Sequence, residues 1–341
     1  MNQDRYKGFP SYVDPLSGKH LTLVDGDDGN AYFTCVSAKT GKACKYPVRK
    51  GIPRFLPTDG GNYADAFGEQ WLRWRTTQLD SHSGTTITKS RLQRCLGNSG
   101  IELLCRQNES TQVLEVGCGA GRFTEILLQY PSARVTSLDL SSAVEANQIN
   151  FPQSEHHRIV QADIMQAPFD GEGFDMVICL GVIQHTPSPE ATISKLFEQV
   201  RPGGMMVIDH YTPDIMRRTK ITALLVRPVV KRLPSKARMK TCEALVSFFF
   251  PIHKSFRKNI LAQHIFSRVS PITTYFHAYP QLPEHLQWEW SILDTHDSLT
   301  DWNKHLRTMK QIESVLKDIG AIKIEVLKGG NGVEARCYKK S

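Results

Sequence analysis

Long apolar runs are missing from the 341-residue chain, since none approaches the ~20 residues that a membrane-spanning helix needs. The longest candidates are residues 221–230, which Arg227 and Pro228 interrupt, and residues 244–252, which end around Pro251. The first residues lack the apolar core of a signal peptide, and low-complexity tracts and internal repeats are also absent. We therefore expect a globular, cytoplasmic protein with ample chain to bury a core.

The eight cysteines lack the regular spacing of a disulfide framework. Cys118, Cys179 and Cys105 stand in apolar or motif contexts instead. This usage favours reduced thiols and agrees with a cytoplasmic location.

Acidic residues are nearly absent from one stretch of a chain whose net charge is +8. Residues 217–240 mix basic and aliphatic side chains in a pattern that favours two amphipathic helices. Such a surface suits peripheral contact with phospholipid or a lipid-linked phosphorylated sugar, or it is a solvated face; nucleic acid is allowed but not favoured. The basic residues are Arg217, Arg218, Lys220, Arg227, Lys231, Arg232, Lys236, Arg238 and Lys240.

Three glycines at alternate positions connect a short apolar run to a helical stretch. Residues 113–116 have the character of a buried parallel strand, and residues 124–128 have helical character. Gly117, Gly119 and Gly121 permit a tight turn with positive φ and let a ligand lie against bare backbone. Free N–H groups at the helix start favour electron-rich ligand groups.

An acid, Glu115, stands two residues before the first glycine and gives the motif E-x-G-C-G-x-G. Dinucleotide enzymes favour G-x-G-x-x-G, and a pyrophosphate gains nothing from a carboxylate at this point. A ligand that carries an ammonium and a sulfonium group does gain. The motif resembles that of the class I S-adenosylmethionine (SAM) dependent methyltransferases.

The resemblance implies a set of cofactor contacts. Asp139 ends the second strand and is placed to accept from both ribose hydroxyls, with helix capping by Asp139 or Ser141 as the alternative. In the family, the acid after the third strand accepts from the adenine amino group, which Asp163 matches, with capping of the next turn as the alternative. The implied cofactor-binding residues are Glu115, Gly117, Cys118, Gly119, Gly121, Asp139, Leu140, Asp163, Ile164, Leu180 and Gln184.

A general base is expected after the fourth strand, where F-D-x-V-x-x-x-x-V-x-x-H resembles the family's fourth motif and ends at His185. Imidazole titrates near neutrality, so His185 is a candidate base, although ordering the loop or contacting the cofactor is the alternative. The segment W-x-x-L-D-T-x-D resembles the same bacterial subgroup. We expect it to be a loop that faces the pocket, with Asp294 and His296 as alternative catalytic residues or with Asp294 or Asp297 as caps.

The first 60 residues are expected to form a small β leader, with a hairpin of residues 21–24 and 31–35. Its Y-P-V-x-x-G-I-P-x-F run resembles the end of zinc-ribbon leaders found before some methyltransferase domains and in the activator subunit of tRNA methyltransferases. Residues 14–17 stand where the first cysteine pair would be, and only Cys35 and Cys44 remain. A structural zinc site needs four ligands, so we expect a degenerate ribbon and no metal.

Alternating strand and helix patterns predict an α/β fold with a Rossmann-like, seven-stranded, doubly wound sheet. In the connector, Trp71 and Trp74 are expected to pack on the sheet, with closure over the cofactor as the alternative, and Arg91 to meet the SAM carboxylate. The predicted parts are the leader (1–60), a helical connector (61–110), the SAM-binding core (111–210), a cap insertion (211–300) and a C-terminal part (301–341) that completes the core. The C-terminal part is expected to contain a helix (302–320) and a β-hairpin (321–327 and 333–338).

The resemblance implies an enzyme that moves a methyl group from SAM to a hydroxyl, amine or carbon of a small-molecule, sugar or lipid-linked acceptor and releases S-adenosylhomocysteine (SAH). The donor is already activated, so catalysis would be largely positioning, and we expect no metal in the core. One alternative is a non-catalytic SAM-binding or activator protein. Another is an NAD-type oxidoreductase, against which Glu115 and the glycine spacing argue.

Overall fold

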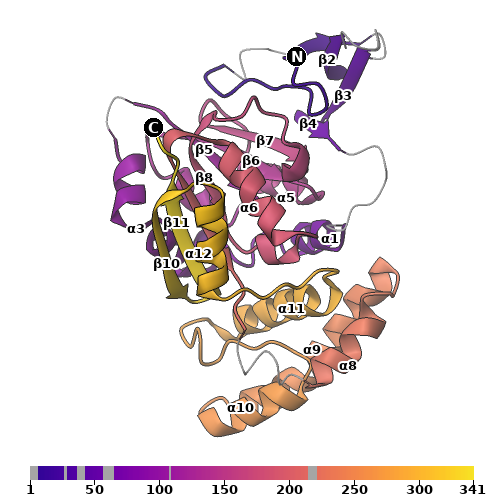
Figure 1. Cartoon of the computed structure of the whole chain (residues 1–341). Helices are drawn as coiled ribbons and strands as arrows, with labels where there is room; N and C mark the ends of the chain where they lie inside the picture. The colour runs from indigo at the N-terminus through magenta and orange to yellow at the C-terminus, as the bar shows by residue number, and fades with distance from the viewer. Residues whose placement is uncertain (1–6, 27–28, 37–42, 57–64, 107–108, 214–220) are drawn as a thin grey trace.

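One sheet of 11 strands runs through the computed structural model, which describes residues 7–26, 29–36, 43–56, 65–106, 109–213 and 221–341 (Figure 1). The strand order is β1-β2-β3-β4-β7-β6-β5-β8-β9-β11-β10. The strands are β1 (Thr22–Asp25), β2 (Ala31–Val36), β3 (Ala43–Arg49), β4 (Ile52–Phe55), β5 (Thr111–Val116), β6 (Ala133–Asp139), β7 (His157–Ala162), β8 (Phe174–Cys179), β9 (Val200–His210), β10 (Ile322–Gly329) and β11 (Gly332–Tyr338).

The stretch β7-β6-β5-β8-β9-β11-β10 is the predicted seven-stranded sheet, and its last two strands form the predicted antiparallel hairpin. The predicted total is nevertheless wrong, because the leader joins the same sheet. Its hairpin of β1 and β2 forms as expected, and β4 then pairs in parallel with β7, with Arg54 beside Gln161 and Phe55 beside Ala162. An edge strand offers unpaired N–H and C=O groups to any extended segment, so the hydrophobic pattern alone does not reveal this pairing.

Apolar side chains alternate along the parallel strands between two cores, one on each face of the sheet. In β5, Val113 belongs to one core and Leu114 to the other. Helices α3 and α4 cover the first face, and α6 and α12 cover the second, so the doubly wound architecture is confirmed. The helices are α1 (Asp65–Arg73), α2 (Asp80–Ser83), α3 (Ile87–Leu104), α4 (Thr124–Leu127), α5 (Ala143–Asn150), α6 (Pro189–Glu198), α8 (Ile221–Val230), α9 (Ser235–Ser255), α10 (Ile260–Val269), α11 (Glu284–Thr300) and α12 (Met309–Asp318), with 3-10 turns at η2 (Ile164–Gln166) and η3 (Ile183–His185).

Helices α8 to α11 form a cap in which α11 packs on α8 and α9, and α10 packs on α8 (Figure 1). The predicted loop around Asp294 is instead part of α11. Leu286, Trp290 and Leu293 recur there at helical spacing, and residues 284–300 contain no Gly or Pro. In the described parts of the chain, no helix is both long and apolar enough to cross a membrane. Arg217, Arg218 and Lys220 of the basic run lie outside the described residues.

The last helix, α12, begins at Met309, so the prediction of a helix from residue 302 is wrong at its start. Thr308 is the N-cap: its hydroxyl accepts from Gln311 N (3.3 Å), and its own N–H donates to Gln311 Oε1 (2.9 Å). This capping box satisfies N–H groups of the first turn and fixes where the helix begins.

In the leader, Asp14, Cys35 and Cys44 bring one ligand atom each to within 4.8 Å of one another. The Asp14 carboxylate is buried and accepts hydrogen bonds from Tyr46 Oη (2.5 Å) and Ser17 N (3.1 Å). These residues supply three donors where a structural zinc ion takes four. The absence of metal from the leader stays a prediction.

Candidate functional site

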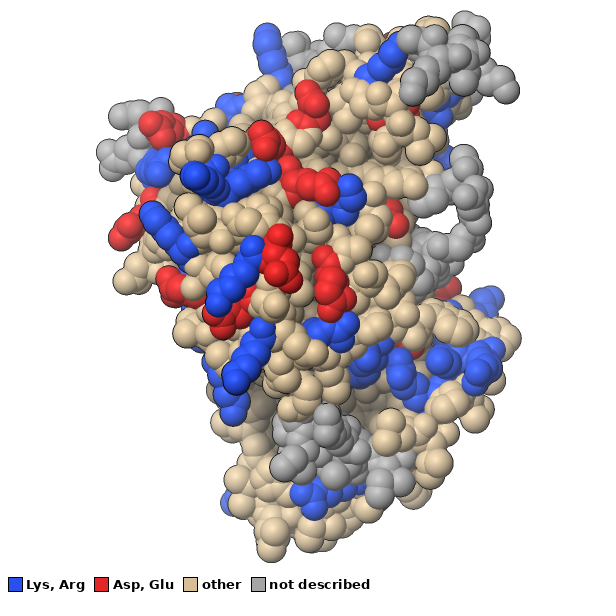
Figure 2. All heavy atoms as spheres, viewed as in Figure 1, with Lys and Arg blue, Asp and Glu red and all other residues tan. Residues whose placement is uncertain are grey.

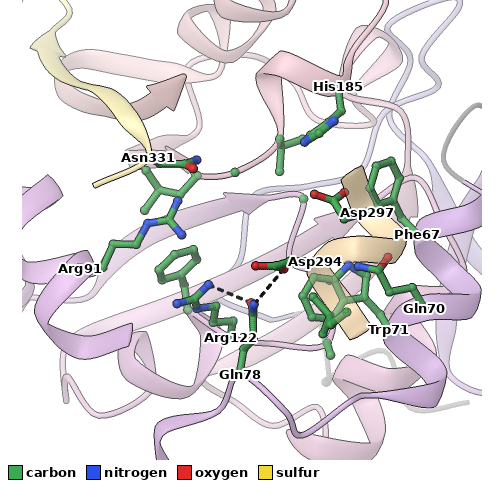
Figure 3. A pocket seen from close by; sticks show the side chains of 18 of the residues that line it. Phe67, Gln70, Trp71, Gln78, Arg91, Arg122, His185, Asp294, Asp297 and Asn331 are labelled. Carbon is green, nitrogen blue, oxygen red and sulfur yellow. Dashed lines mark hydrogen bonds between the residues drawn. The ribbon is translucent and has the colours of Figure 1, made fainter. Parts of the chain in front are cut away.

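A cavity of about 1290 Å³ lies between the carboxyl ends of the parallel strands and helices α1, α3, α8 and α11 (Figure 3). Figure 3 shows Arg91 and Arg122 on one side of it and His185, Asp297 and Phe67 on the other. Of the residues predicted from the sequence, those that line it are Gly117, Cys118, Gly119, Asp139, Leu140, Asp163, Ile164, Leu180, His185 and Asp294. Glu115, Gly121, Gln184 and His296 are not among the described residues that line it.

The glycine loop between β5 and α4 presents bare backbone to the cavity. Gly117 and Gly119 have φ of +74° and +51°. A Cβ on Gly117 would lie 2.2 Å from Val182, and a Cβ on Gly119 would lie 3.2 Å from the ring of Trp71. A side chain at either position would therefore be strained and crowded. Trp71 lines the cavity next to this loop, and Trp74 packs against the apolar cluster of the cap around Phe250, so the predicted packing of both residues on the sheet is wrong. Closure over the cofactor stays a prediction.

Asp139 stands at the end of β6 and braces the glycine loop. Its Oδ2 accepts from Gly119 N (2.9 Å), and its Oδ1 accepts from Ser141 N (2.8 Å) and Ser141 Oγ (2.7 Å). Burial raises the pKa of this carboxyl, and the hydrogen bonds partly oppose the shift. A carboxylate has about four lone-pair sites, so one remains for a ligand hydroxyl.

Asp163 follows β7 and caps the turn η2, since its Oδ1 accepts from Met165 N (2.9 Å). The capping alternative is therefore realised. Asp163 also lines the cavity together with Ile164, and burial raises the pKa of its carboxyl. A capping role uses only one of its two oxygens.

Glu115 is buried beneath the glycine loop rather than beside the cavity. Its Oε2 accepts from Thr124 Oγ1 (2.5 Å) and Ser137 Oγ (3.0 Å), while its Oε1 has no hydrogen-bond partner in the part of the chain that the structure describes. Burial raises its pKa from 4.5 to about 7, and the two hydroxyls only partly oppose the shift. Glu115 therefore ties the loop helix α4 to strand β6.

Replacing Glu115 with Gln is expected to make the stability less dependent on pH. Because the folded-state pKa is raised, folded protein holds a proton between pH 4.5 and about 7 that the unfolded chain has released, so stability falls as pH rises through this window. Glu115→Gln keeps an oxygen for both hydroxyls and removes this loss, which amounts to about 3 kcal/mol. Urea unfolding at pH 5 and pH 8 without ligand measures it. The exposed Glu102→Gln serves as a control, and parallel pH profiles for Glu115→Gln and wild type would contradict the expectation.

His185 lines the cavity, and its ring lies next to the carboxylate of Asp301. Its Nδ1 is 3.2 Å from Asp301 Oδ2 and 3.3 Å from the carbonyl oxygen of Asn303. The rings of Phe67 and Tyr211 meet it edge-on, with centroids 5.3 and 5.5 Å away. Burial lowers the pKa of His185, but the charges of Asp297 and Asp301 outweigh burial and raise it above its ordinary value.

Asp301 is itself fixed by the cap. Arg227 of α8 donates to its Oδ1 from Nε (2.9 Å) and to its backbone carbonyl from Nη2 (2.9 Å). Burial raises the pKa of Asp301, but His185, Lys304 and Arg227 together lower it below its ordinary value. The carboxylate therefore stays ionised beside the imidazole.

Asp294 projects from α11 into the middle of the cavity (Figure 3). Burial and the charge of Asp297 raise its pKa to about 7. Gln78 links it to a buried cation: Gln78 Nε2 lies 3.5 Å from Asp294 Oδ1, and Gln78 Oε1 accepts from Arg122 Nη1 (2.8 Å). Burial lowers the pKa of Arg122 to about 10, and its guanidinium lies over the ring of Trp290 (5.4 Å).

Arg91 of α3 lines the cavity and forms an ion pair with Asp209 at the end of β9, while its contact with the SAM carboxylate stays a prediction. Burial alone would lower the pKa of Arg91, but Asp209 raises it. Asp209 also accepts from Gly181 N (2.6 Å) and Asn331 Nδ2 (3.3 Å). Any ligand carboxylate that meets Arg91 therefore competes with Asp209.

Two predicted residues lie behind the lining. His296 is buried, and its Nδ1 is 2.7 Å from Oε1 of Gln70, the residue that faces the cavity; burial lowers its pKa to about 4. Gln184 is buried, and neither of its side-chain polar atoms has a hydrogen-bond partner among the described residues. Neither residue touches the cavity, so neither is retained as a direct contact.

Sequence reasoning missed Arg122 and Asp301, and it gave Asp297 only the role of a cap. Arg122 directly follows the glycine loop, and Asp297 lies one helical turn after Asp294, so spacing offered a signal for these two. Asp301 gave no signal, because its contact with His185 joins residues far apart in the sequence.

Residues 114–208 match the family model described as a methyltransferase domain. The chain is similar to a malonyl-[acyl-carrier protein] O-methyltransferase of Paenibacillus sp. (36% identical, 30% of this chain and 40% of that protein). It is also similar to a trans-aconitate 2-methyltransferase of Paracidovorax citrulli (37%, covering 31% and 42%) and a ubiquinone biosynthesis O-methyltransferase of Pseudomonas fluorescens (32%, covering 28% and 42%). The chain spans about two fifths of the length of these relatives. A solved structure of a putative SAM-dependent methyltransferase of Methanococcus maripaludis covers 84% of this chain and 98% of its own, with 14% identity and a TM-score of 0.42.

Proposed function

We propose, from the premise that residues 114–208 form a methyltransferase domain, that the whole chain is a SAM-dependent methyltransferase. The observation that carries the proposal is the cavity at the carboxyl ends of β5 to β8, where the glycine loop, Asp139 and Asp163 converge. Ligands of open α/β sheets bind at this edge.

The residues present fit SAM. The bare backbone of Gly117 and Gly119 leaves room for a ligand where a Cβ would crowd Val182 or Trp71. Asp139 retains one lone-pair site for a ribose hydroxyl, and Asp163 retains its second oxygen for the adenine amino group. The cavity volume of about 1290 Å³ exceeds the ~300–1,000 Å³ usual for one ligand, which leaves space for an acceptor.

When bound, SAM supplies a methyl group that is already activated for transfer. The side chains of this protein then have two tasks, positioning and proton removal. The Asn303 carbonyl oxygen (3.3 Å) and the Asp301 carboxylate (3.2 Å) both lie next to His185 Nδ1 and favour a proton there, so Nε2 takes the proton of an acceptor hydroxyl or amine. Asp301 stabilises the imidazolium that results, and Phe67 and Tyr211 hold the ring in place.

Asp294 is the alternative base, because its pKa of about 7 also suits proton transfer near neutral pH. We place His185 first, since a second group orients it and its charged form is stabilised. His296 is not retained, because Gln70 separates it from the cavity.

The acceptor is proposed to be a small, sugar or lipid-linked molecule with an anionic group. Arg122 faces the cavity as a buried cation that donates hydrogen bonds to the neutral Gln78 and Thr88 side chains, and the nearby charges of Asp294 and Asp80 only partly offset the effect of burial on its pKa. A carboxylate or phosphate on the acceptor would complete its charge pairing. The names of the relatives, which include acyl-carrier and aconitate methyltransferases, agree with an anionic acceptor. They do not identify the substrate of this chain.

The experiment that tests this function follows SAH release from SAM with soluble and lipid-linked hydroxyl, amine and carboxyl compounds. We expect acceptor-dependent release by the purified chain, and slower release from acceptors without an anionic group. Release that appears with no acceptor class until a second protein is added would instead support the activator alternative.

A further inference from the structure

Helices α8 and α10 expose aliphatic side chains on the surface of the cap. In α8 the exposed residues are Leu224, Leu225, Pro228 and Val229, which repeat at helical spacing. In α10, Leu261, Ile265 and Val269 form an exposed i, i+4, i+8 stripe. The exposed side of a surface helix is normally polar, so both helices reverse the usual pattern.

The two helices are neighbours. α10 packs on α8, and Thr222 Oγ1 near the start of α8 donates to the carbonyl of Arg268 near the end of α10 (3.3 Å). The exposure is large: Leu225 is 70% and Leu261 is 68% exposed. Trp302, next to Lys231 at the end of α8, is also half-exposed. We call this surface, made by residues 224, 225, 228, 229, 261, 265 and 269, the α8–α10 face.

The segment of the chain that carries the α8–α10 face is strongly basic. Residues 221–270 contain ten Lys or Arg and one acid, Glu243, an excess larger than the net charge of the entire chain. Two of these basic residues form ion pairs, Arg227 with Asp301 and Lys254 with Glu284. On the side shown in Figure 2, the cap shows Lys, Arg and uncharged surface, whereas Asp and Glu gather over the central sheet.

The cavity reaches the surface at this face. Leu224 is 58% exposed and also lines the cavity, as do Ala223 and Arg227 of the same helix. The helix that exposes the apolar side chains thus also forms part of the cavity wall and holds Asp301 behind His185.

We propose that the α8–α10 face docks on an anionic phospholipid bilayer and that the acceptor enters from the bilayer past Leu224. Aliphatic side chains flanked by Lys and Arg match the acyl boundary and the anionic headgroups of such a surface. Each helix has 10 residues, half of the ~20 that a span needs, and therefore lies along the bilayer. The docking itself is independent of the proposed methyl transfer, whereas the acceptor route rests on it.

Two other occupants fit less well. A second copy of the chain would bring two basic segments together, which is electrostatically unfavourable. Nucleic acid would use the Lys and Arg side chains but gains no hydrogen bonds or base stacking from Leu, Ile and Val. Both are outcomes of the test.

The test is sedimentation of the full chain with vesicles of phosphatidylcholine alone or with one third phosphatidylglycerol. We expect binding to the anionic vesicles that weakens at high salt. Leu261→Glu/Ile265→Glu, and separately Leu225→Glu/Val229→Glu, should lower the partition coefficient at least tenfold. The control Ile149→Glu/Leu327→Glu changes two exposed side chains outside the cap and should bind as wild type does.

Light scattering without lipid and SAH binding by each variant complete the experiment. Unchanged SAH affinity in the cap variants shows that they remain folded and separates docking from the proposed function. Binding to neither vesicle, equal losses in the control, self-association that the Leu261→Glu/Ile265→Glu change abolishes, or capture of an oligonucleotide instead of vesicles would each overturn the proposal.

Discussion

Asp139→Ala is expected to weaken SAM binding by about tenfold to several hundredfold. The substitution removes the one carboxylate lone-pair site that is left for a ribose hydroxyl, and a hydrogen bond to a charged group contributes ~1.5–3 kcal/mol, or about one to two factors of ten. It also removes the acceptor for Gly119 N, which loosens the glycine loop. Calorimetric titration of wild type and variant with SAM measures the change.

Two matched variants separate the two effects. Ser141→Ala keeps the carboxylate and removes one of its three internal donors, so its SAM affinity should stay within about threefold of wild type. Asp139→Asn keeps the size of the side chain and should lie between the other two variants. Wild-type affinity in Asp139→Ala would contradict the assignment of Asp139 to the cofactor.

His185→Ala is expected to lower kcat by roughly a hundredfold to ten-thousandfold, the range for removal of a general base. The affinity for SAM should hardly change, because the proposed role of His185 concerns the acceptor proton. A turnover assay with a saturating acceptor, together with calorimetry, makes the comparison. If His185→Ala keeps its turnover while Asp294→Asn loses it, the base is Asp294.

Asp301→Asn tests how His185 is tuned. The charges of Asp297 and Asp301 raise the pKa of His185, and the neutral imidazole is the active base, so activity rises with pH through that pKa. Removing the Asp301 charge lowers the pKa of His185 and should move this acid limb to lower pH, with a smaller loss of kcat than in His185→Ala. Thermal unfolding controls for the loss of the Arg227 contact. If kcat falls but the acid side of the pH–activity profile stays at the same pH, Asp301 has a structural role only.

Most of the predicted residues that line the cavity lie within single strand-loop units. Gly117, Gly119, Asp139, Asp163 and His185 each follow a parallel strand, and parallel strands bring their carboxyl ends to one edge. Local pattern and sheet geometry are therefore sufficient to place them at the cavity.

The residues that sequence reasoning missed or misplaced depend on contacts between distant segments. Asp301 reaches His185 only because the end of α11 lies beside the loop after β8. The ion pair of Arg91 with Asp209 was not predicted, and it forms because α3 packs against β9. Glu115 and His296 were predicted as direct contacts, but packing buries them behind Thr124 and Gln70. Such outcomes depend on side-chain packing, which spacing does not encode.

In the leader, too, the sequence predicts local structure but not the contact between distant segments. Its hairpin follows from alternating residues and a turn, and it forms as predicted. The leader joins the main sheet because β4 pairs with β7, and these two strands are separated by about a hundred residues in the sequence.

Calorimetric titration of the wild-type chain with SAH, and in parallel with NAD, tests the central claim most directly. We predict saturable binding of one SAH per chain and no heat from NAD, because the glycine loop, Asp139 and Asp163 fit a single adenosine moiety and leave the rest of the cavity to the acceptor. Saturable binding of NAD without binding of SAH would contradict the assignment of this cavity to SAM.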